Sequence, residues 1–212
     1  MTDELLGLLE ESRQRGFLGP GPVEVHLDHA RAFVVAAEVP PTRALDLGAG
    51  GGLPGLVLAA IAWPDARWTF LDAMAKRTAF LREAVDRLGL ADRVEVLTER
   101  AEVAGRDAEH RGGYDLVVAR SFGPPAVVLE CAAPLLRPGG RLVVSEPPDA
   151  VLAERWPPEG VRAFGGAAPR AVTAGHRHEV HLVVIDQHEA CPDRYPRRVG
   201  VPTKRPLFTS PT

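Results

Sequence analysis

The sequence has little cysteine, no long apolar run and no strong excess of charge of either sign. Two cysteines, Cys131 and Cys191, occur in 212 residues, and they lack the spacing of a metal site or a disulfide framework. No apolar run approaches the roughly eighteen residues that a bilayer crossing requires, and the N-terminal stretch lacks the layout of a signal peptide. These absences predict a cytoplasmic protein with no bound metal and no membrane partner.

Charge is distributed unevenly along the chain. The formal net charge of −3 gives no global sign of a nucleic-acid partner. The C-terminal residues 191–212, however, carry five bases against one acid. Three of these basic side chains are predicted to bind RNA phosphates: Arg197, Arg198 and Lys204. The alternative is that this tail packs on the rest of the protein and that Tyr195 and Leu207 hold it there.

Short apolar runs alternate with amphipathic helical patterns over the middle of the chain. Strand patterns occur at 43–47, 67–71, 94–97, 114–119, 141–144 and 180–185, and helical patterns occur at 53–62, 75–88 and 126–136. Near-continuous apolar strands separated by helices predict an α/β fold, with a doubly wound, mostly parallel sheet covered on both faces. Residues 147–169 are rich in proline, glycine and alanine and predict a long irregular connection.

Three parts follow from this pattern. Residues 1–42 hold two helical patterns separated by a glycine and proline cluster, and they predict a short N-terminal helical cap. Residues 43–190 contain the alternation of strands and helices and form the ligand-binding domain. Residues 191–212 form the basic C-terminal tail.

A glycine-rich stretch, "LDLGAGGGLPG" at 45–55, follows the first strand. Glycines between a strand and a helix let a ligand approach the backbone, where a Cβ would collide with it. Read from Gly50, the stretch matches G-x-G-x-x-G, which is typical of dinucleotide binding. Read from Asp46, it matches D-x-G-x-G-x-G, the nucleoside loop of methyltransferases that use S-adenosylmethionine.

Two carboxylates bear on the choice between these ligands. Asp72 ends the second strand, where it can accept hydrogen bonds from both hydroxyls of an adenosine ribose, and this suits either ligand. Asp46 lies two residues before the first glycine, Gly48. A carboxylate there can face the ammonium group of a methionine moiety and would repel a pyrophosphate. The sequence therefore favours S-adenosylmethionine, and an NAD-dependent oxidoreductase stays as the alternative.

The loop after the fourth strand meets the transferred group in such a fold. It reads "ARSFGPP", in which Arg120, Ser121 and Phe122 offer a guanidinium, a hydroxyl and an aromatic face. These groups can hold a base but cannot accept a proton at neutral pH. A ring nitrogen such as guanine N7 needs no general base, because positioning it in line with the sulfonium methyl is enough. Alternatively, Arg120 is a structural charge that closes the strand end.

With these residues in view, the chain resembles the glucose-inhibited division protein B family, the bacterial guanine-N7 methyltransferases of small-subunit ribosomal RNA. The resemblance extends over nearly everything from His26 to Leu207. The segments that carry it are "ALDLGAGGGLPGL", "LDAMAKRTAFL", "ERAE", "YDLVVARSF" and, most specifically, "RYPRRVGVPTKRPL". It implies a Rossmann-like class I methyltransferase fold and S-adenosylmethionine as the cofactor.

The resemblance also implies roles for individual residues. The cofactor would be bound by Gly48, Leu53, Asp72, Ala73, Met74, Ala101 and Glu102, together with Asp46 and Gly50 of the loop, and Arg120 would lie beside the methyl donor. Glu102 and Ala101 would flank the adenine, and Asp72 would hold the ribose. The partner would be small-subunit ribosomal RNA or an assembling ribosomal particle, and the protein is expected to act as a monomer.

The chain departs from the family pattern at three places, one of which is the segment "VHLDHARAF", which only partly matches the family's entry helix. After the fifth strand, where the family usually has lysine before glycine, Ser145 and Glu146 replace a positive charge with a negative one. Ala73 replaces the usual serine after the ribose aspartate. These departures leave open a divergent, non-catalytic protein that binds RNA or assists ribosome assembly with the same fold.

Overall fold

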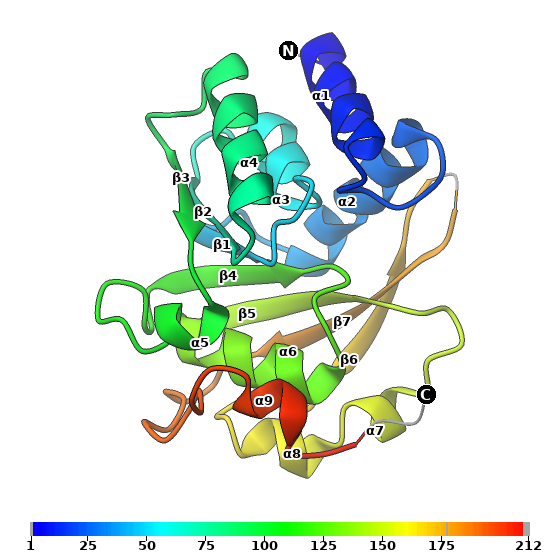
Figure 1. Ribbon diagram of the computed structural model, residues 1–212. Coiled ribbons are helices and arrows are strands. Elements are labelled where there is room, and N and C mark those ends of the chain that lie inside the picture. The colour runs from blue at the N-terminus through cyan, green and yellow to red at the C-terminus, as the bar shows by residue number, and fades with distance from the viewer. Residues whose placement is uncertain (1, 177, 210–212) are drawn as a thin grey trace.

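The computed structural model describes residues 2–176 and 178–209, and in these residues one twisted sheet separates two layers of helices (Figure 1). The sheet has seven strands in the order β3-β2-β1-β4-β5-β7-β6. Its strands are β1 (Arg43–Leu47), β2 (Arg67–Asp72), β3 (Val94–Thr98), β4 (Tyr114–Ala119), β5 (Leu136–Glu146), β6 (Arg170–Ala174) and β7 (Val180–Asp186). Strands β1 to β5 are parallel, and β7 is antiparallel to both of its neighbours. The predicted doubly wound, mostly parallel sheet is confirmed.

Helices cover both faces of the sheet. One layer holds α1 (Thr2–Gln14), α2 (Val23–Ala37), α3 (Gly55–Val57) with the π-helical turn Leu58–Ala62, and α4 (Ala75–Arg87). The other holds α5 (Ala101–Ala104), α6 (Pro125–Ala132) with the 3-10 turn Ala133–Leu135, α8 (Pro158–Arg162) and α9 (Val201–Lys204), and α7 (Leu152–Arg155) precedes α8. Two separate hydrophobic clusters fill the two interfaces between helices and sheet.

Side chains of β1 alternate between these two clusters. Ala44 belongs to the cluster beneath α1 to α4, whereas Leu45 and Leu47 belong to the cluster beneath α5 and α6. Because successive residues of a strand point to opposite faces, Asp46 shares the face of Ala44 and α3. This register places a carboxylate beneath the glycine-rich loop that follows the strand.

The N-terminal cap is packed into the domain rather than appended to it. Leu5, Leu8 and Leu9 of α1 are fully buried, and the Ser12 hydroxyl donates to the carbonyl oxygen of Gly51 at 2.9 Å. The cap therefore holds the glycine-rich loop from outside. Among the described residues, no helix has the length and apolar character needed to span a bilayer.

Three features of the secondary structure differ from the prediction. Residues 147–169 are not irregular throughout, because they include α7 and α8. Strand β5 starts at Leu136 rather than at 141, where the strand pattern begins, and it has a register shift against β4. Strand β6 was missed, since its side chains are only partly covered at the edge of the sheet and only pairing with β7 makes it a strand.

The strand order reverses between β1 and β4. In an open α/β sheet the loops on either side of such a reversal diverge at the carboxyl ends of the strands and leave a crevice for a ligand. The glycine-rich loop leaves β1 at this point and residues 120–124 leave β4. The topology thus fixes where the site lies.

Candidate functional site

The glycine-rich loop is tied to the end of β2. The backbone N–H groups of Gly48 and Ala49 both donate to the carbonyl oxygen of Leu71, at 2.8 and 3.0 Å. Gly48 has φ +74°, and a Cβ on it would lie 2.6 Å from Cδ2 of Phe122. Glycine is required here by backbone conformation and by the close approach of the β4 loop.

Asp72 holds the same loop through hydrogen bonds to its backbone. Its Oδ2 accepts the N–H of Gly50 at 3.0 Å and its Oδ1 accepts the N–H of Met74 at 2.8 Å, while Arg77 Nη1 lies 3.5 Å from Oδ2. An ionised carboxylate offers about four acceptor positions. Asp72 therefore organises the loop and keeps acceptor capacity on the side that faces the cleft.

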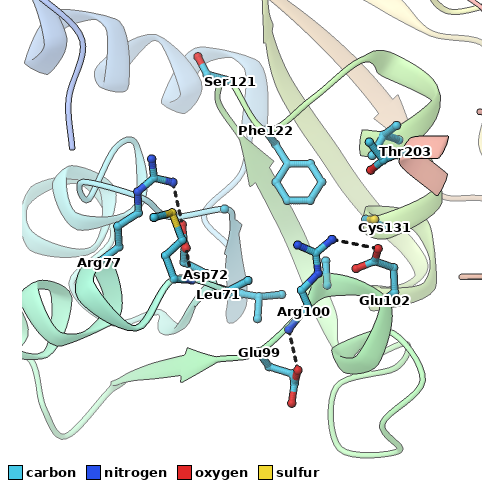
Figure 2. Close-up of a pocket in the computed structure, with 15 residues that line it drawn as sticks. Leu71, Asp72, Arg77, Glu99, Arg100, Glu102, Ser121, Phe122, Cys131 and Thr203 are labelled. Atoms are coloured by element: carbon cyan, nitrogen blue, oxygen red, sulfur yellow. Dashed lines mark hydrogen bonds and ion pairs between the residues drawn. The ribbon is translucent and has the colours of Figure 1, made fainter. Parts of the chain in front are cut away.

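The cleft that most of the predicted cofactor residues line, called the main cleft, has a volume of about 300 Å³ and is bordered by Asp72 (Figure 2). Its lining comprises Gly48, Leu71, Asp72, Ala73, Met74, Arg77, Glu99, Arg100, Ala101, Glu102, Ser121, Phe122, Val127, Cys131 and Thr203. Six of the residues predicted to bind a cofactor meet here: Gly48, Asp72, Ala73, Met74, Ala101 and Glu102. Their binding role stays a prediction, but the fold brings them together from three strand ends.

A second cavity of about 190 Å³ adjoins the main cleft along the glycine-rich loop. Gly50 and Leu53 line it with Arg120, and Gly48, Arg77 and Ser121 line both spaces. The ring of Phe122 projects into the main cleft from the β4 loop. A ligand long enough to reach from one space into the other would pass beside Gly48.

Asp46 does not lie in the cleft, contrary to the prediction that it faces a ligand. It is fully buried, and its Oδ2 accepts the N–H of Gly55 at 2.7 Å. Oδ1 has no hydrogen-bond partner among the described residues. Burial raises the pKa of this carboxyl to about 7, against the hydrogen bond from Gly55. The alternation of β1 explains the error, because it turns this side chain under the loop.

Glu102 has a structural role in addition to the cofactor contact that the resemblance implies. Its carboxylate is almost completely buried, and Oε1 accepts the N–H of Gly200 at 2.8 Å and an N–H of Arg100 at 3.3 Å. Burial works against ionisation, but these donors hold the pKa of Glu102 below its ordinary value. The side chain thus anchors the C-terminal segment at the rim of the cleft, where Thr203 of α9 contributes to the wall.

Arg120 separates two spaces. It lines the cavity of about 190 Å³ and a third cavity of about 370 Å³, whose other polar lining includes His29, Glu146 and Arg155. Its Nη2 lies 3.0 Å from Nδ1 of His26, whereas Nη1 is buried without a hydrogen-bond partner among the described residues. Burial lowers the pKa of the guanidinium, and the nearby Asp46 carboxylate offsets part of this effect.

The negative charge of Glu146, the last residue of β5, is balanced by a neighbouring basic side chain. Glu146 has a side chain only 5% exposed and pairs with Arg155 at the end of α7. The Nε of Arg155 donates to Oε2 and its Nη2 lies 3.5 Å from Oε1. The pair keeps the wall of the third cavity near neutral, so the departure at this position does not make the cavity acidic.

The C-terminal tail packs against α6. Glu130 is completely buried and accepts three hydrogen bonds from Arg197, through its backbone N–H, Nε and Nη2 at 2.9, 2.8 and 2.6 Å. The guanidinium of Arg197 is thus engaged by a buried carboxylate, and its contact with an RNA phosphate stays a prediction. Arg198 and Lys204 are exposed, and their contact with RNA stays a prediction.

The alternative prediction, that Tyr195 and Leu207 hold the tail, fits Tyr195 but not Leu207. Tyr195 is buried, with its ring 4.4 Å from that of Phe164 between centroids, whereas Leu207 is 43% exposed. The buried pair Arg197 and Glu130 supplies the fastening that was expected of Leu207.

Several site residues were not identified from the sequence. Arg77 comes within the first turn of α4, so its spacing from Asp72 was a usable signal. His26 lies on α2, far from the loop in sequence, and only the packing of the cap brings it to Arg120. Within the described residues, no cluster of three histidine, cysteine, aspartate or glutamate side chains could hold a metal ion.

Comparison with known proteins places this geometry in a family. A family model described as GidB, rRNA small subunit methyltransferase G, matches residues 26–146. A ribosomal RNA small subunit methyltransferase G of Rubrobacter xylanophilus is 36% identical over 98% of this chain and 83% of its own length. One of Syntrophomonas wolfei is 32% identical over 94% of this chain and 95% of its own.

Solved structures agree on the fold. An O-methyltransferase from Bacillus cereus, solved in complex with SAH, superposes with a TM-score of 0.61 at 18% identity, over 86% of this chain and 90% of that chain. Similarity at this level of identity concerns the fold alone. The match over residues 26–146 and the two relatives of similar length show that the chain belongs to the GidB family, the rRNA small subunit methyltransferase G proteins.

Proposed function

We propose that the chain transfers the methyl group of S-adenosylmethionine to N7 of a guanine in small-subunit ribosomal RNA. One observation carries the proposal, in a member of the GidB family: Ser121 lines the nucleoside-sized cleft, the adjoining cavity and the third cavity alike, and its neighbour Arg120 lines the last two. The name of the family's curated relatives, ribosomal RNA small subunit methyltransferase G, supports the choice of substrate.

The residues of the main cleft fit the nucleoside part of the cofactor. Asp72 keeps acceptor capacity for ribose hydroxyls, and Leu71, Ala73 and Met74 offer apolar surface beside it. The adjoining cavity, with Gly50 and Leu53, would take the methionine part. When bound, S-adenosylmethionine supplies an electrophilic methyl group on a sulfonium.

The surroundings of Asp46 argue against a dinucleotide. A pyrophosphate binds to free N–H groups at the start of a helix. Here the N–H of Gly55, the first residue of α3, is already taken by Asp46, and Pro54 before it has no N–H. The helix begins with few donors to offer and with a buried carboxyl group beneath it, which favours the nucleoside methyl donor over NAD.

The side chains around the third cavity suit an acceptor atom that needs no general base. His29 has its pKa lowered to about 4, first by burial and then by the charge of Arg120. In the main cleft, burial raises the pKa of Cys131 well above its ordinary value, which disfavours a thiolate nucleophile there. Guanine N7 carries a lone pair and no proton, so holding it in line with the methyl group is sufficient.

The proposal includes the partner and the assembly state. Arg198 and Lys204 are exposed on the segment that also carries Thr203 into the cleft wall, and they would contact RNA phosphates near the site. The protein would act as a monomer. The substrate would be ribosomal RNA or an assembling ribosomal particle in the cytoplasm.

The test is the modification state of ribosomal RNA in a strain that lacks the gene. Mass spectrometry of nucleosides from small-subunit RNA should show the loss of a 7-methylguanosine, restored by the wild-type gene and not by one encoding Arg120→Ala. If the ribosomal RNA is fully modified without the gene, the protein does not catalyse this methylation and is instead a non-catalytic RNA-binding protein. Restoration by the Arg120 variant would return that residue to a structural role at the strand end.

A further inference from the structure

The guanidinium of Arg120 is held by a side chain from outside the β4 loop. We infer that His26, on α2 of the N-terminal cap, is a positioning residue for methyl transfer, which sets the orientation of Arg120 at the junction of the cavities. The inference rests on the proposed function, because it assigns Arg120 a place beside the reacting groups. His26 itself lines none of the three cavities at this end of the sheet, so it would act through Arg120.

The hydrogen bonds of His26 determine its protonation. Arginine is always charged and can only donate, so the contact of 3.0 Å between Arg120 Nη2 and His26 Nδ1 requires a lone pair on Nδ1. The proton of the neutral ring is then on Nε2, which donates to the carbonyl oxygen of Gly19 at 3.2 Å. Nδ1 therefore acts as the acceptor for Arg120, and Nε2 acts as the donor to Gly19.

This arrangement fixes the guanidinium without cancelling its charge. A carboxylate in the place of His26 would form an ion pair and draw the positive charge away from a ligand. A neutral acceptor gives one directional hydrogen bond and leaves the charge intact. Arg120 Nη1 remains buried without a partner among the described residues, so one donor is available to the methionine carboxylate or to the acceptor base.

Burial supports a fixed geometry. His26 is only 6% exposed, and α2 packs on the sheet through Leu27, Ala30 and Phe33. The helix cannot shift without opening the core, so the position of Nδ1 is set by the packing of the cap. In an arginine with four rotatable bonds, this contact selects one orientation of the guanidinium from many.

Two substitutions separate the contacts of His26. In His26→Asn, the amide oxygen lies where Nδ1 was and can still accept from Arg120. In His26→Gln, the longer amide reaches the place of Nε2 and can still donate to Gly19, but Arg120 loses its acceptor. Both variants remove the imidazole, so a role in packing alone would affect them alike.

The experiment measures methylation of small ribosomal subunits from a strain lacking the gene, with cofactor binding by calorimetry and melting temperature as controls. We expect His26→Gln to lower kcat by about 10- to 100-fold, with cofactor Kd and melting temperature close to those of His26→Asn, which retains most of the wild-type kcat. Equal losses of kcat in the two variants, or losses that follow melting temperature, would overturn the inference.

Failure of the proposed function is recognised separately. If the wild-type protein transfers no methyl group, that proposal fails, and crystal structures of the two variants then test the positioning itself. The Arg120 guanidinium should keep its place in His26→Asn and leave it in His26→Gln. An unchanged guanidinium in both variants would show that His26 does not position it.

Discussion

At the scale of single residues, Asp46 and Asp72 lie near the ends of neighbouring strands but differ in burial and in hydrogen bonding. Asp46 is fully buried with one unpartnered oxygen, and Asp72 borders the cleft with two backbone donors. Both were predicted as site residues, because a sequence shows that a carboxylate ends a strand. Which side of the glycine-rich loop it occupies depends on the strand register, which the sequence pattern alone does not provide.

Asp46→Asn should change how stability depends on pH. The pKa of Asp46 rises from 3.8 to about 7 on folding, so the folded state binds this proton more tightly than the unfolded chain. Wild-type stability should therefore fall as pH rises from about 4 to 7, by at most about 4 kcal/mol. Asparagine can still accept from Gly55 but does not ionise.

The measurement is urea unfolding of both proteins between pH 5 and pH 8. The variant should gain stability relative to wild type as pH rises through 7, and the difference should level off above it. A difference that is constant over this range would mean that Asp46 does not titrate between the folded and unfolded states as its burial implies.

Asp72→Ala should weaken binding of S-adenosylmethionine by roughly 1–3 kcal/mol, the usual loss for charge-assisted hydrogen bonds. The variant also releases the N–H groups of Gly50 and Met74, so part of the loss comes from a looser loop. Calorimetry with S-adenosylmethionine and with NAD checks this expectation. Binding of NAD by the wild type, without binding of S-adenosylmethionine, would contradict the assignment of the cleft.

At the scale of elements, the patterns that the sequence predicts well are those set by periodicity. The spans at 43–47 and 114–119 coincide with β1 and β4, and helix α4 ends one residue before its predicted limit. Elements set by tertiary contacts were missed: β6 is made by pairing with β7, and α9 lies on α6 in a C-terminal tail whose sequence has five prolines. The helical cap was predicted, but its contact with Arg120 was not, because 94 residues separate His26 from that arginine.

The C-terminal segment offers a matched pair of substitutions. Arg197→Gln leaves the buried Glu130 carboxylate without its guanidinium, and breaking such a pair costs roughly 2–4 kcal/mol when one partner is partly exposed. Arg198→Gln, at the adjacent exposed position, should change stability little. Urea unfolding of the two variants checks this, and equal stability in both would mean that the tail does not depend on its ion pair.

At the scale of the whole molecule, the site is assembled from parts far apart in the sequence. The loop after β1, the end of β2, the turn into α5, the loop after β4 and α9 all reach the main cleft. The fold brings one segment, α9, to both the cleft wall and the outer surface, with Thr203 lining the cleft and Lys204 exposed. RNA bound outside and cofactor bound inside would therefore share one structural element.

The double variant Arg198→Gln with Lys204→Gln tests the outer surface. Melting temperature and cofactor binding should remain near wild type, because neither side chain lines the cleft. Affinity for ribosomal RNA should fall, and the dependence of log affinity on log salt should flatten by up to about 2 units, since two phosphate contacts are lost. An unchanged salt dependence would place the RNA surface elsewhere, around Arg120 and the cap.

Methyl transfer by the purified protein can be measured directly. Small ribosomal subunits from a strain lacking the gene are incubated with the protein and S-adenosylmethionine that carries a deuterated methyl group, and the nucleosides are then analysed by mass spectrometry. We expect deuterated 7-methylguanosine as the product, with far less formed by Arg120→Ala. Absence of label from RNA, or label on another atom or base, would contradict this expectation.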